Sequence, residues 1–303
     1  MSTVVETAYG PVRGVDGGVR SWLGVRYGAP PTGGLRWRAP EPPQPWTDVA
    51  DASILGPVCP QPVDPRIPID LGAPQGDDCL TLNIWASSDI AAGDRKPVMV
   101  WIHGGAYVLG SANQPMYDGR VLAAGGDVVV VTVNYRLGAF GFLDLSSFST
   151  PRRRFESNLG LRDVLHALHW IRDNIAAFGG DPDRVTVFGE SAGSWSVNVV
   201  QATPLARGLL HRAIGESGAQ FARTARLADA EKGGAAVASA VGADSLNALR
   251  AVPAEKLNTV QSFRTGVNVD GYVLPDEVRT IFAQKKQNDV PVLIGSNANE
   301  WTT

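Results

Sequence analysis

The stretch Val185-Thr-Val-Phe-Gly-Glu-Ser-Ala-Gly193 decides the fold. Its apolar start is typical of a buried strand, and the segment after it has helical character up to Thr203-Pro204. Glycines on both sides of Ser191 remove the Cβ atoms that would collide where a strand turns sharply into a helix. The pattern predicts a nucleophile elbow with the Ser191 hydroxyl at its tip. The alternatives are a structural turn or a phosphate loop, and no Lys-Ser/Thr pair follows to favour phosphate.

Further apolar runs predict the sheet around this elbow. Val98–Ile102 and Val128–Val133 are uninterrupted, as in parallel strands that are buried on both faces. Between Leu161 and Phe178 apolar residues recur at helical spacing, with Asn158 available as N-cap and Gly179-Gly180 as the stop. We therefore expect an α/β fold with a mostly parallel central sheet that helices cover.

The flanking regions are less regular. The first ninety residues are turn-rich, and we expect an irregular N-terminal β region there. Residues 227–260 are Ala-rich with breaks at Gly233-Gly234, Gly242 and Pro253, which predicts two or three short helices in a cap-like insertion. A strand at Val292–Ile294 follows. No linker or repeat divides the chain, so residues 1–303 are expected to form a single domain.

A second glycine motif, His103-Gly-Gly-Ala-Tyr107, follows the strand ending at Ile102. Such loops offer backbone N–H groups to an oxyanion, and Gly105 and Ala106 are the expected donors. Ala192 should provide a third donor at the positive end of the helix after the elbow. A tight glycine turn without a role in binding is the structural alternative.

Composition excludes several classes. With 27 basic and 30 acidic residues the formal charge is −3, which gives no sign of a nucleic-acid partner. No apolar run reaches the ~18 residues of a membrane span, and the N-terminus lacks a signal-peptide pattern, so we expect a cytoplasmic protein. Cys59 and Cys79 are either free thiols or a disulfide worth roughly 3 kcal/mol, and composition leaves both open.

The chain resembles the type-B carboxylesterase family, which includes cholinesterases and bacterial para-nitrobenzyl esterases. The resemblance covers essentially all 303 residues and rests on the elbow and on a series of shared segments: Arg26-Tyr-Gly-Ala-Pro-Pro31, Asp77-Asp-Cys-Leu-Thr-Leu-Asn83, Trp101-Ile-His-Gly-Gly-Ala106, Asn134-Tyr-Arg-Leu-Gly138, Asn158-Leu-Gly-Leu161, Asn174-Ile-Ala-Ala-Phe-Gly-Gly-Asp-Pro182 and Glu216-Ser-Gly218. It implies an α/β-hydrolase fold. The Gly-Gly-Ala form of the oxyanion loop is closer to the bacterial branch, which implies broad specificity for small esters.

The resemblance also implies further site residues. Ile294-Gly-Ser-Asn-Ala-Asn-Glu300 matches the family segment that carries the triad acid, so Glu300 is the expected acid, although Trp301 stands where the family usually has glycine. A disulfide between Cys59 and Cys79 is implied by many relatives, whereas para-nitrobenzyl-type enzymes often lack it. If the N-terminus is not native, such a bridge fits a secreted protein. Tyr107, Trp195 and Phe263 are candidate pocket aromatics, with core packing as the alternative.

The resemblance further implies that the catalytic histidine lies outside this chain. In such hydrolases the order is Ser, acid, His, and no histidine follows Glu300. His103, His166, His169 and His211 all have structural explanations. We therefore expect a Ser-His-Glu carboxylic ester hydrolase for small or aryl esters, without metal or cofactor, that lacks its C-terminal part and is inactive as an isolated piece. A C-terminal fragment of the same protein is a candidate partner, and a non-catalytic cholinesterase-like binding protein is the alternative.

Overall fold

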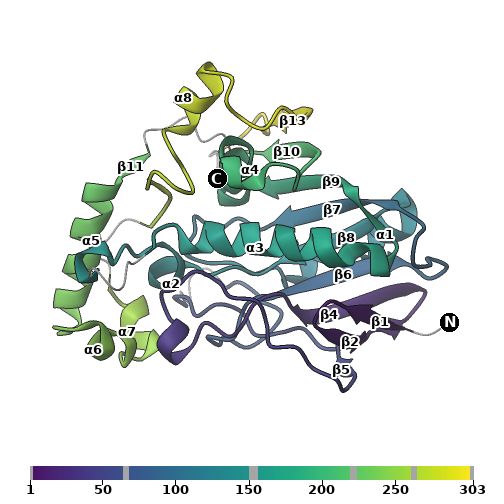
Figure 1. The fold of residues 1–303 in the computed structure, drawn as a ribbon, viewed down its shortest axis with the longest axis horizontal. Coiled ribbons are helices and arrows are strands. Elements are labelled where there is room, and N and C mark those ends of the chain that lie inside the picture. The colour runs from purple at the N-terminus through teal and green to yellow at the C-terminus, as the bar shows by residue number, and fades with distance from the viewer. Residues whose placement is uncertain (1–2, 64–67, 150–155, 219–223, 261–264, 301–303) are drawn as a thin grey trace.

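A mixed sheet of eight strands forms the centre of the molecule (Figure 1). The computed structural model describes residues 3–63, 68–149, 156–218, 224–260 and 265–300. The strand order is β13-β10-β9-β7-β8-β6-β4-β3; the first five run parallel, and the last three pair antiparallel. The strands are β3 (Val15–Asp16), β4 (Val19–Arg26), β6 (Thr81–Ser87), β7 (Lys96–Ile102), β8 (Val129–Val133), β9 (Gly180–Glu190), β10 (Arg212–Glu216) and β13 (Val292–Gly295). The predicted parallel core is confirmed.

Smaller elements surround this sheet. A three-stranded sheet contains β1 (Val4–Thr7), β2 (Gly10–Arg13) and β5 (Ala50–Asp51), and β11 (Ala225–Arg226) pairs with β12 (Asn268–Val269). The α-helices are α1 (Arg120–Gly126), α2 (Gly138–Phe142), α3 (Leu159–Asn174), α4 (Ala192–Ala202), α5 (Leu227–Ala240), α6 (Leu246–Arg250), α7 (Ala254–Asn258) and α8 (Val278–Ala283). Single 3₁₀ turns lie at Gly33–Leu35, Pro115–Tyr117, Ser146–Phe148, Ile175–Phe178 and Pro204–Ala206.

The core is built where the apolar runs predicted it. All five residues of β8 are buried, and helix α3 crosses one face of the sheet (Figure 1). Helix α3 is followed by a 3₁₀ turn that ends at Gly179, whose φ of 82° is one that glycine adopts without steric cost. Asn158 does not cap α3 as predicted. It has a φ of 54°, and its amide instead pairs with the backbone of Asn268, donating at 2.9 Å and accepting at 2.9 Å.

The parallel strands determine where a site can form. The chain leaves β7 at His103, β9 at Ser191, β10 at Ser217 and β13 just before Ser296. Because the carboxyl ends of parallel strands meet at one edge of a sheet, the four segments that follow these strands lie side by side. The elbow, the glycine loop and the segment that carries Glu300 therefore share one edge.

Residues 227–260 contain α5, α6 and α7, which lie at one end of the molecule in Figure 1. The predicted break at Gly233-Gly234 is wrong, because α5 continues through both residues. A Cβ atom at Gly234 would lie 1.6 Å from the carbonyl oxygen of Asp144. This glycine therefore allows close packing of α5 rather than ending it.

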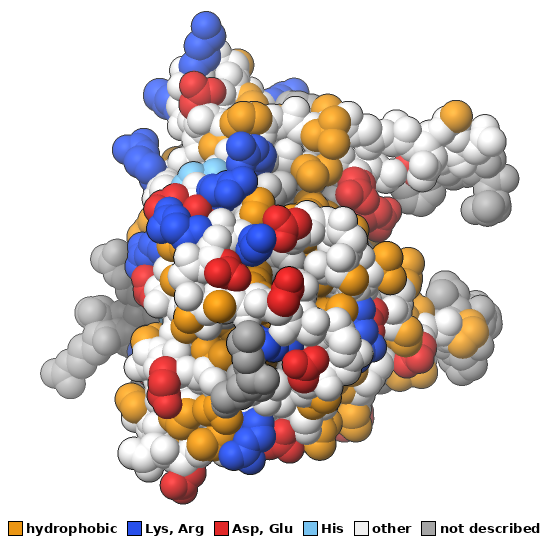
Figure 2. Space-filling view, turned by 90° about the vertical axis from the view of Figure 1, so that its right-hand side faces the viewer, with side chains coloured by type: hydrophobic (Ala, Val, Ile, Leu, Met, Phe, Trp, Pro, Cys, Tyr) orange, Lys and Arg blue, Asp and Glu red, His pale blue; other side chains and the backbone are white. Residues whose placement is uncertain are grey.

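The surface carries both signs of charge. Figure 2 shows acidic and basic side chains interspersed on one face, with no large area of a single sign. Among the described residues, no helix has the length and apolar character needed to cross a bilayer. The edge strand β13 stands out, because Val292, Leu293 and Ile294 are 52%, 66% and 54% exposed. Its apolar side chains are thus uncovered on both faces of the sheet.

Candidate active site

Ser191 sits at the turn between β9 and α4 in a strained backbone conformation, with φ 53° and ψ −119°. Such a conformation is costly for a non-glycine residue and persists only where the surroundings enforce it. Here the Ser191 N–H donates to Glu216 O at 2.9 Å, and the Ser191 carbonyl accepts from Trp195 N–H at 2.9 Å in the first turn of α4. The serine is therefore fixed on both sides.

The two flanking glycines allow α4 to approach β7. A Cβ atom at Gly189 would lie 2.6 Å from Ile102 O, and one at Gly193 would lie 2.0 Å from the same oxygen. Any side chain at either position would displace the helix or the strand. The geometry explains why the Gly-x-Ser-x-Gly pattern occurs here, and it provides the close approach of helix and strand that the predicted elbow requires.

The glycine loop lies against this elbow. A Cβ atom at Gly104 would be 2.8 Å from Glu190 O and 3.3 Å from Ser191 Cβ. Gly105, Ala106 and Tyr107 follow with φ values of 107°, 55° and 61°. A run of positive φ turns successive N–H groups in directions that regular structure does not use.

The three predicted oxyanion donors remain unpaired. Within the described part of the chain, no acceptor is found for the backbone N–H of Gly105, Ala106 or Ala192. Ala192 is in addition the first residue of α4, where the helix dipole favours negative charge. Unpaired N–H groups beside Ser191 are what the oxyanion-hole prediction requires.

Glu300 lies at the same edge of the sheet. Its Oε1 accepts from Asn297 N–H at 2.9 Å and from the Ser217 hydroxyl. Ser217 follows β10 and donates its own N–H to Gly295 O at 2.8 Å, which ties it to β13. The bond from Ser217, and then that from Asn297, lowers the pKa of the Glu300 carboxyl, so it is ionised at neutral pH. In the sequence, Ser217 stands out only as part of Glu216-Ser-Gly218, and nothing there indicates this contact with Glu300.

A second carboxylate, that of Glu190 next to Ser191, could not be singled out from the sequence. Glu190 is half-buried, and burial first, then the charges of Glu300 and Glu216, raise its pKa. Glu190 and Glu216 are register partners on adjacent strands. Negative charge therefore concentrates at this sheet edge, where it would stabilise a positively charged imidazolium.

None of the four histidines, all of which lie in the described part of the chain, is bonded to Ser191. His103 is buried, its Nδ1 donates to Gly104 O at 2.8 Å, its ring stacks on Tyr135, and burial lowers its pKa to about 4. His166 and His169 lie on α3. His211 Nδ1 accepts from Val185 N–H, six residues before Ser191, which is roughly 20 Å along a strand. The general base is thus not supplied by these residues.

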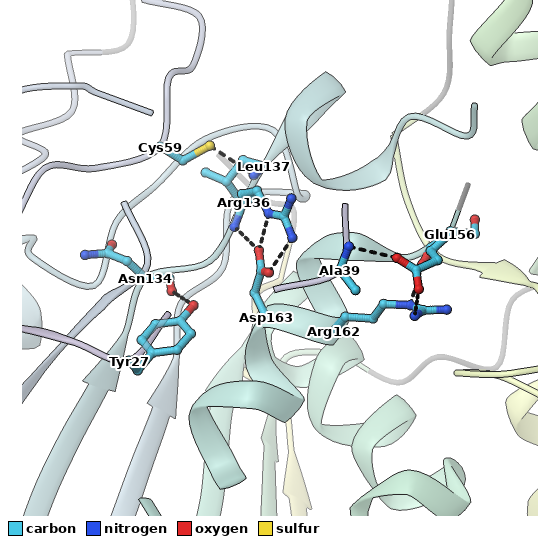
Figure 3. Close-up of polar contacts among 10 residues, drawn as sticks. Tyr27, Ala39, Cys59, Asn134, Arg136, Leu137, Glu156, Arg162 and Asp163 are labelled. Atoms are coloured by element: carbon cyan, nitrogen blue, oxygen red, sulfur yellow. Dashed lines mark hydrogen bonds and ion pairs between the residues drawn. The ribbon is translucent and has the colours of Figure 1, made fainter. Parts of the chain in front are cut away.

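Cys59 and Cys79 are free thiols, so the disulfide expected from the resemblance is not formed. Both are buried, and the Cys59 sulfur accepts from Leu137 N–H at 3.2 Å, next to the buried ion pair of Arg136 and Asp163 (Figure 3). The contact with the Cys59 thiol, and then burial, raise the pKa of the Cys79 thiol. Two buried free thiols therefore stand where the resemblance implied a disulfide.

The three aromatic residues predicted to line a pocket have different surroundings. Tyr107 is buried, with its ring centroid 4.5 Å from that of Phe142, and Ser196 Oγ lies 3.2 Å from its hydroxyl; it is a core residue. Trp195 is partly buried on α4, and Phe263 lies outside the described residues.

A cavity of about 430 Å³ is lined by Phe142, with Arg226, Asn268 and Glu277 among its other lining residues. Its volume is within the range of small-molecule pockets.

Mixed sheet, elbow and glycine loop together define the α/β-hydrolase fold. No cluster of three or more His, Cys, Asp or Glu side chains that could hold a metal occurs in the described ranges. The chain belongs to the carboxylesterase family, whose model matches residues 1–303.

Individual relatives agree with this assignment. Para-nitrobenzyl esterase of Bacillus subtilis is 44% identical over 98% of this chain, and human carboxylesterase 3 is 38% identical over 98%. A solved structure of a thermophilic PNB esterase superposes with a TM-score of 0.91 at 43% identity over 99% of this chain. The chain spans 63% of the B. subtilis enzyme and 64% of the thermophilic structure.

Proposed function

We propose that this chain is the nucleophile-bearing part of a carboxylic ester hydrolase that acts on small or aryl esters through a Ser-His-Glu acyl-enzyme mechanism. The observation that carries the proposal is Ser191, held at positive φ between two glycines and beside N–H groups without acceptors. The catalytic histidine would come from outside residues 1–303.

The reaction would run in two steps. Ser191 Oγ attacks the ester carbonyl carbon while the histidine takes its proton, and the carbonyl oxygen becomes an oxyanion that accepts from Gly105, Ala106 and Ala192. The histidine then gives the proton to the leaving alkoxide, which departs as an alcohol. Water repeats the attack on the acyl-enzyme and restores Ser191. Glu300 would orient the histidine and stabilise its charged form.

The surroundings of Glu300 support a histidine arriving there. Its carboxylate is held by Ser217 and Asn297 but has no cationic partner among the described residues. The neighbouring strand β13 exposes three apolar side chains. A further stretch of polypeptide that covers β13 would bury this surface and bring its own side chains to Glu300.

A chimera tests the proposal. Residues 1–303 are joined to the remaining part of the B. subtilis para-nitrobenzyl esterase, and hydrolysis of 4-nitrophenyl acetate is measured with Ser191→Ala as control. We expect the chimera to exceed the isolated chain by at least about 10³-fold, because loss of one triad member leaves only binding and the oxyanion hole. A folded chimera whose rate equals that of its Ser191→Ala variant would refute the mechanism.

The second candidate, a non-catalytic binding protein, is favoured by one observation: in the described part of the chain no histidine bonds to Ser191. In that case the Ser191→Ala exchange changes no measurable property of the chimera toward esters. The unpaired N–H groups of Gly105, Ala106 and Ala192 favour the catalytic proposal, because a protein that only binds a partner does not require an oxyanion hole.

A further inference from the structure

One buried glutamine links a distant loop to the oxyanion loop. The side chain of Gln61 is bonded to both backbone groups of Gly110: its Oε1 accepts from Gly110 N–H at 2.7 Å, and its Nε2 donates to Gly110 O at 2.9 Å. Gln61 is 4% exposed, so these bonds are shielded from water. Gln61 has no part in the proposed acyl-transfer chemistry.

Gly110 closes the oxyanion loop. Its φ is 104°, and a Cβ atom on it would lie 2.8 Å from both Gly104 O and His103 Nδ1. The two ends of the loop are therefore in contact. Between them, Gly105 O accepts from Val108 N–H at 2.9 Å and from Leu109 N–H at 3.0 Å. The loop has no regular strand or helix to hold it, and strained φ values persist only where neighbours enforce them.

Gln61 is itself held rigidly. Its Nε2 also donates to Cys59 O at 3.0 Å, and its backbone N–H donates to Gln75 Oε1 at 2.8 Å. The amide has only one orientation that fits, because two carbonyl oxygens face its nitrogen and one N–H faces its oxygen. The Gln61 side chain thus holds Gly110, 49 residues further along the chain, in a fixed position.

We propose that Gln61 is the positioning residue of the oxyanion hole: by fixing Gly110 it sets where the N–H groups of Gly105 and Ala106 lie relative to Ser191. This inference rests on the proposed function. Oxyanion donors act over 2.7–3.1 Å, and a shift of about 1 Å costs on the order of 10²-fold in rate. Gly104, already in contact with the elbow, would carry any movement of Gly110 toward Ser191.

The first measurement needs no catalysis. Hydrogen–deuterium exchange on the 303-residue chain follows the Val108 and Leu109 amides, whose bonds do not involve Gln61. In Gln61→Met, which is nearly isosteric and apolar, we expect these amides to exchange at least about tenfold faster. Unchanged exchange would overturn the proposal.

A matched control separates positioning from stability. Asn174 is 3% exposed. Like Gln61, its side-chain amide bonds to backbone groups on both sides: it accepts from Ala8 N–H at 2.7 Å and donates to Trp170 O at 2.8 Å. It lies at the end of α3, away from the oxyanion loop. Asn174→Leu should lower the melting temperature as Gln61→Met does, while leaving exchange of Val108 and Leu109 as in the unchanged chain.

The second measurement uses the chimera. In Gln61→Met we expect kcat for 4-nitrophenyl acetate to fall about 10- to 100-fold with KM within about threefold, and affinity for a boronic acid that forms a tetrahedral adduct to fall in parallel. Faster exchange with unchanged kcat would reduce Gln61 to a structural residue. If the unsubstituted chimera has no esterase activity, the proposed function fails, and the exchange result alone decides whether Gln61 fixes the loop.

Discussion

Replacing Gly193 by alanine probes the contact that makes the elbow possible. The new Cβ atom would lie 2.0 Å from Ile102 O and 3.0 Å from His103 O, both backbone atoms at the end of β7. Ordinary contacts begin near 3.4 Å, so α4 and β7 must separate by more than 1 Å. Neither can move freely, because α4 packs on the sheet and β7 pairs with β8 and β9.

We expect this substitution to cost about 3 kcal/mol, the upper part of the range for overpacking. An unfolding entropy of about 2.1 cal/mol/K per residue over 303 residues is about 0.6 kcal/mol/K, so the melting temperature should fall by about 5 °C. Thermal unfolding by circular dichroism measures it. The control is Gly125→Ala in α1, where a Cβ meets nothing within 4 Å and should be neutral or stabilising by up to about 1 kcal/mol. Equal melting temperatures for Gly193→Ala and the unchanged chain would refute the account of the elbow.

Three further predictions concern the buried polar groups. Asp163→Asn should destabilise the chain by roughly 3–5 kcal/mol, because it leaves the Arg136 guanidinium buried without its counter-charge; an unaltered urea midpoint would argue against the pair. Cys59 and Cys79 should not react with a thiol reagent in the folded chain, yet both should react after unfolding without reductant, and an unfolded sample with no reactive thiol would show that they form a disulfide. Because the pKa of His103 is about 4 when folded and about 6.5 when unfolded, the unfolded chain binds the extra proton between these values. Stability should therefore fall by about 3 kcal/mol as the pH is lowered from 6.5 to 4, and His103→Gln should lose this part of the pH dependence in urea unfolding; an identical slope would contradict it.

The sequence predicts the parts of this fold that depend on local pattern. The apolar run Val129–Val133 lies in the sheet because both faces of that strand are buried. The two glycines around Ser191 identify the elbow because a strand-to-helix turn leaves no room for other residues. These signals need no knowledge of distant contacts.

Features that depend on distant partners could not be predicted in this way. The sequence predicts Asn158 as a helix cap, but its side-chain amide instead forms hydrogen bonds with the backbone of Asn268, 110 residues away. Gly234 reads as a helix break, but it accommodates Asp144. Gln61 and Ser217 acquire their roles only from the residues that the fold brings to them, Gly110 and Glu300.

The most direct test of the account is covalent labelling of the nucleophile. The chimera is treated with a fluorophosphonate, and the modified peptide is identified by mass spectrometry. We predict stoichiometric modification on Ser191, no modification in Ser191→Ala, and much slower labelling of the isolated chain, because none of its four histidines is bonded to Ser191. Label on another residue, or none on Ser191 in a folded chimera, would contradict its assignment as the nucleophile.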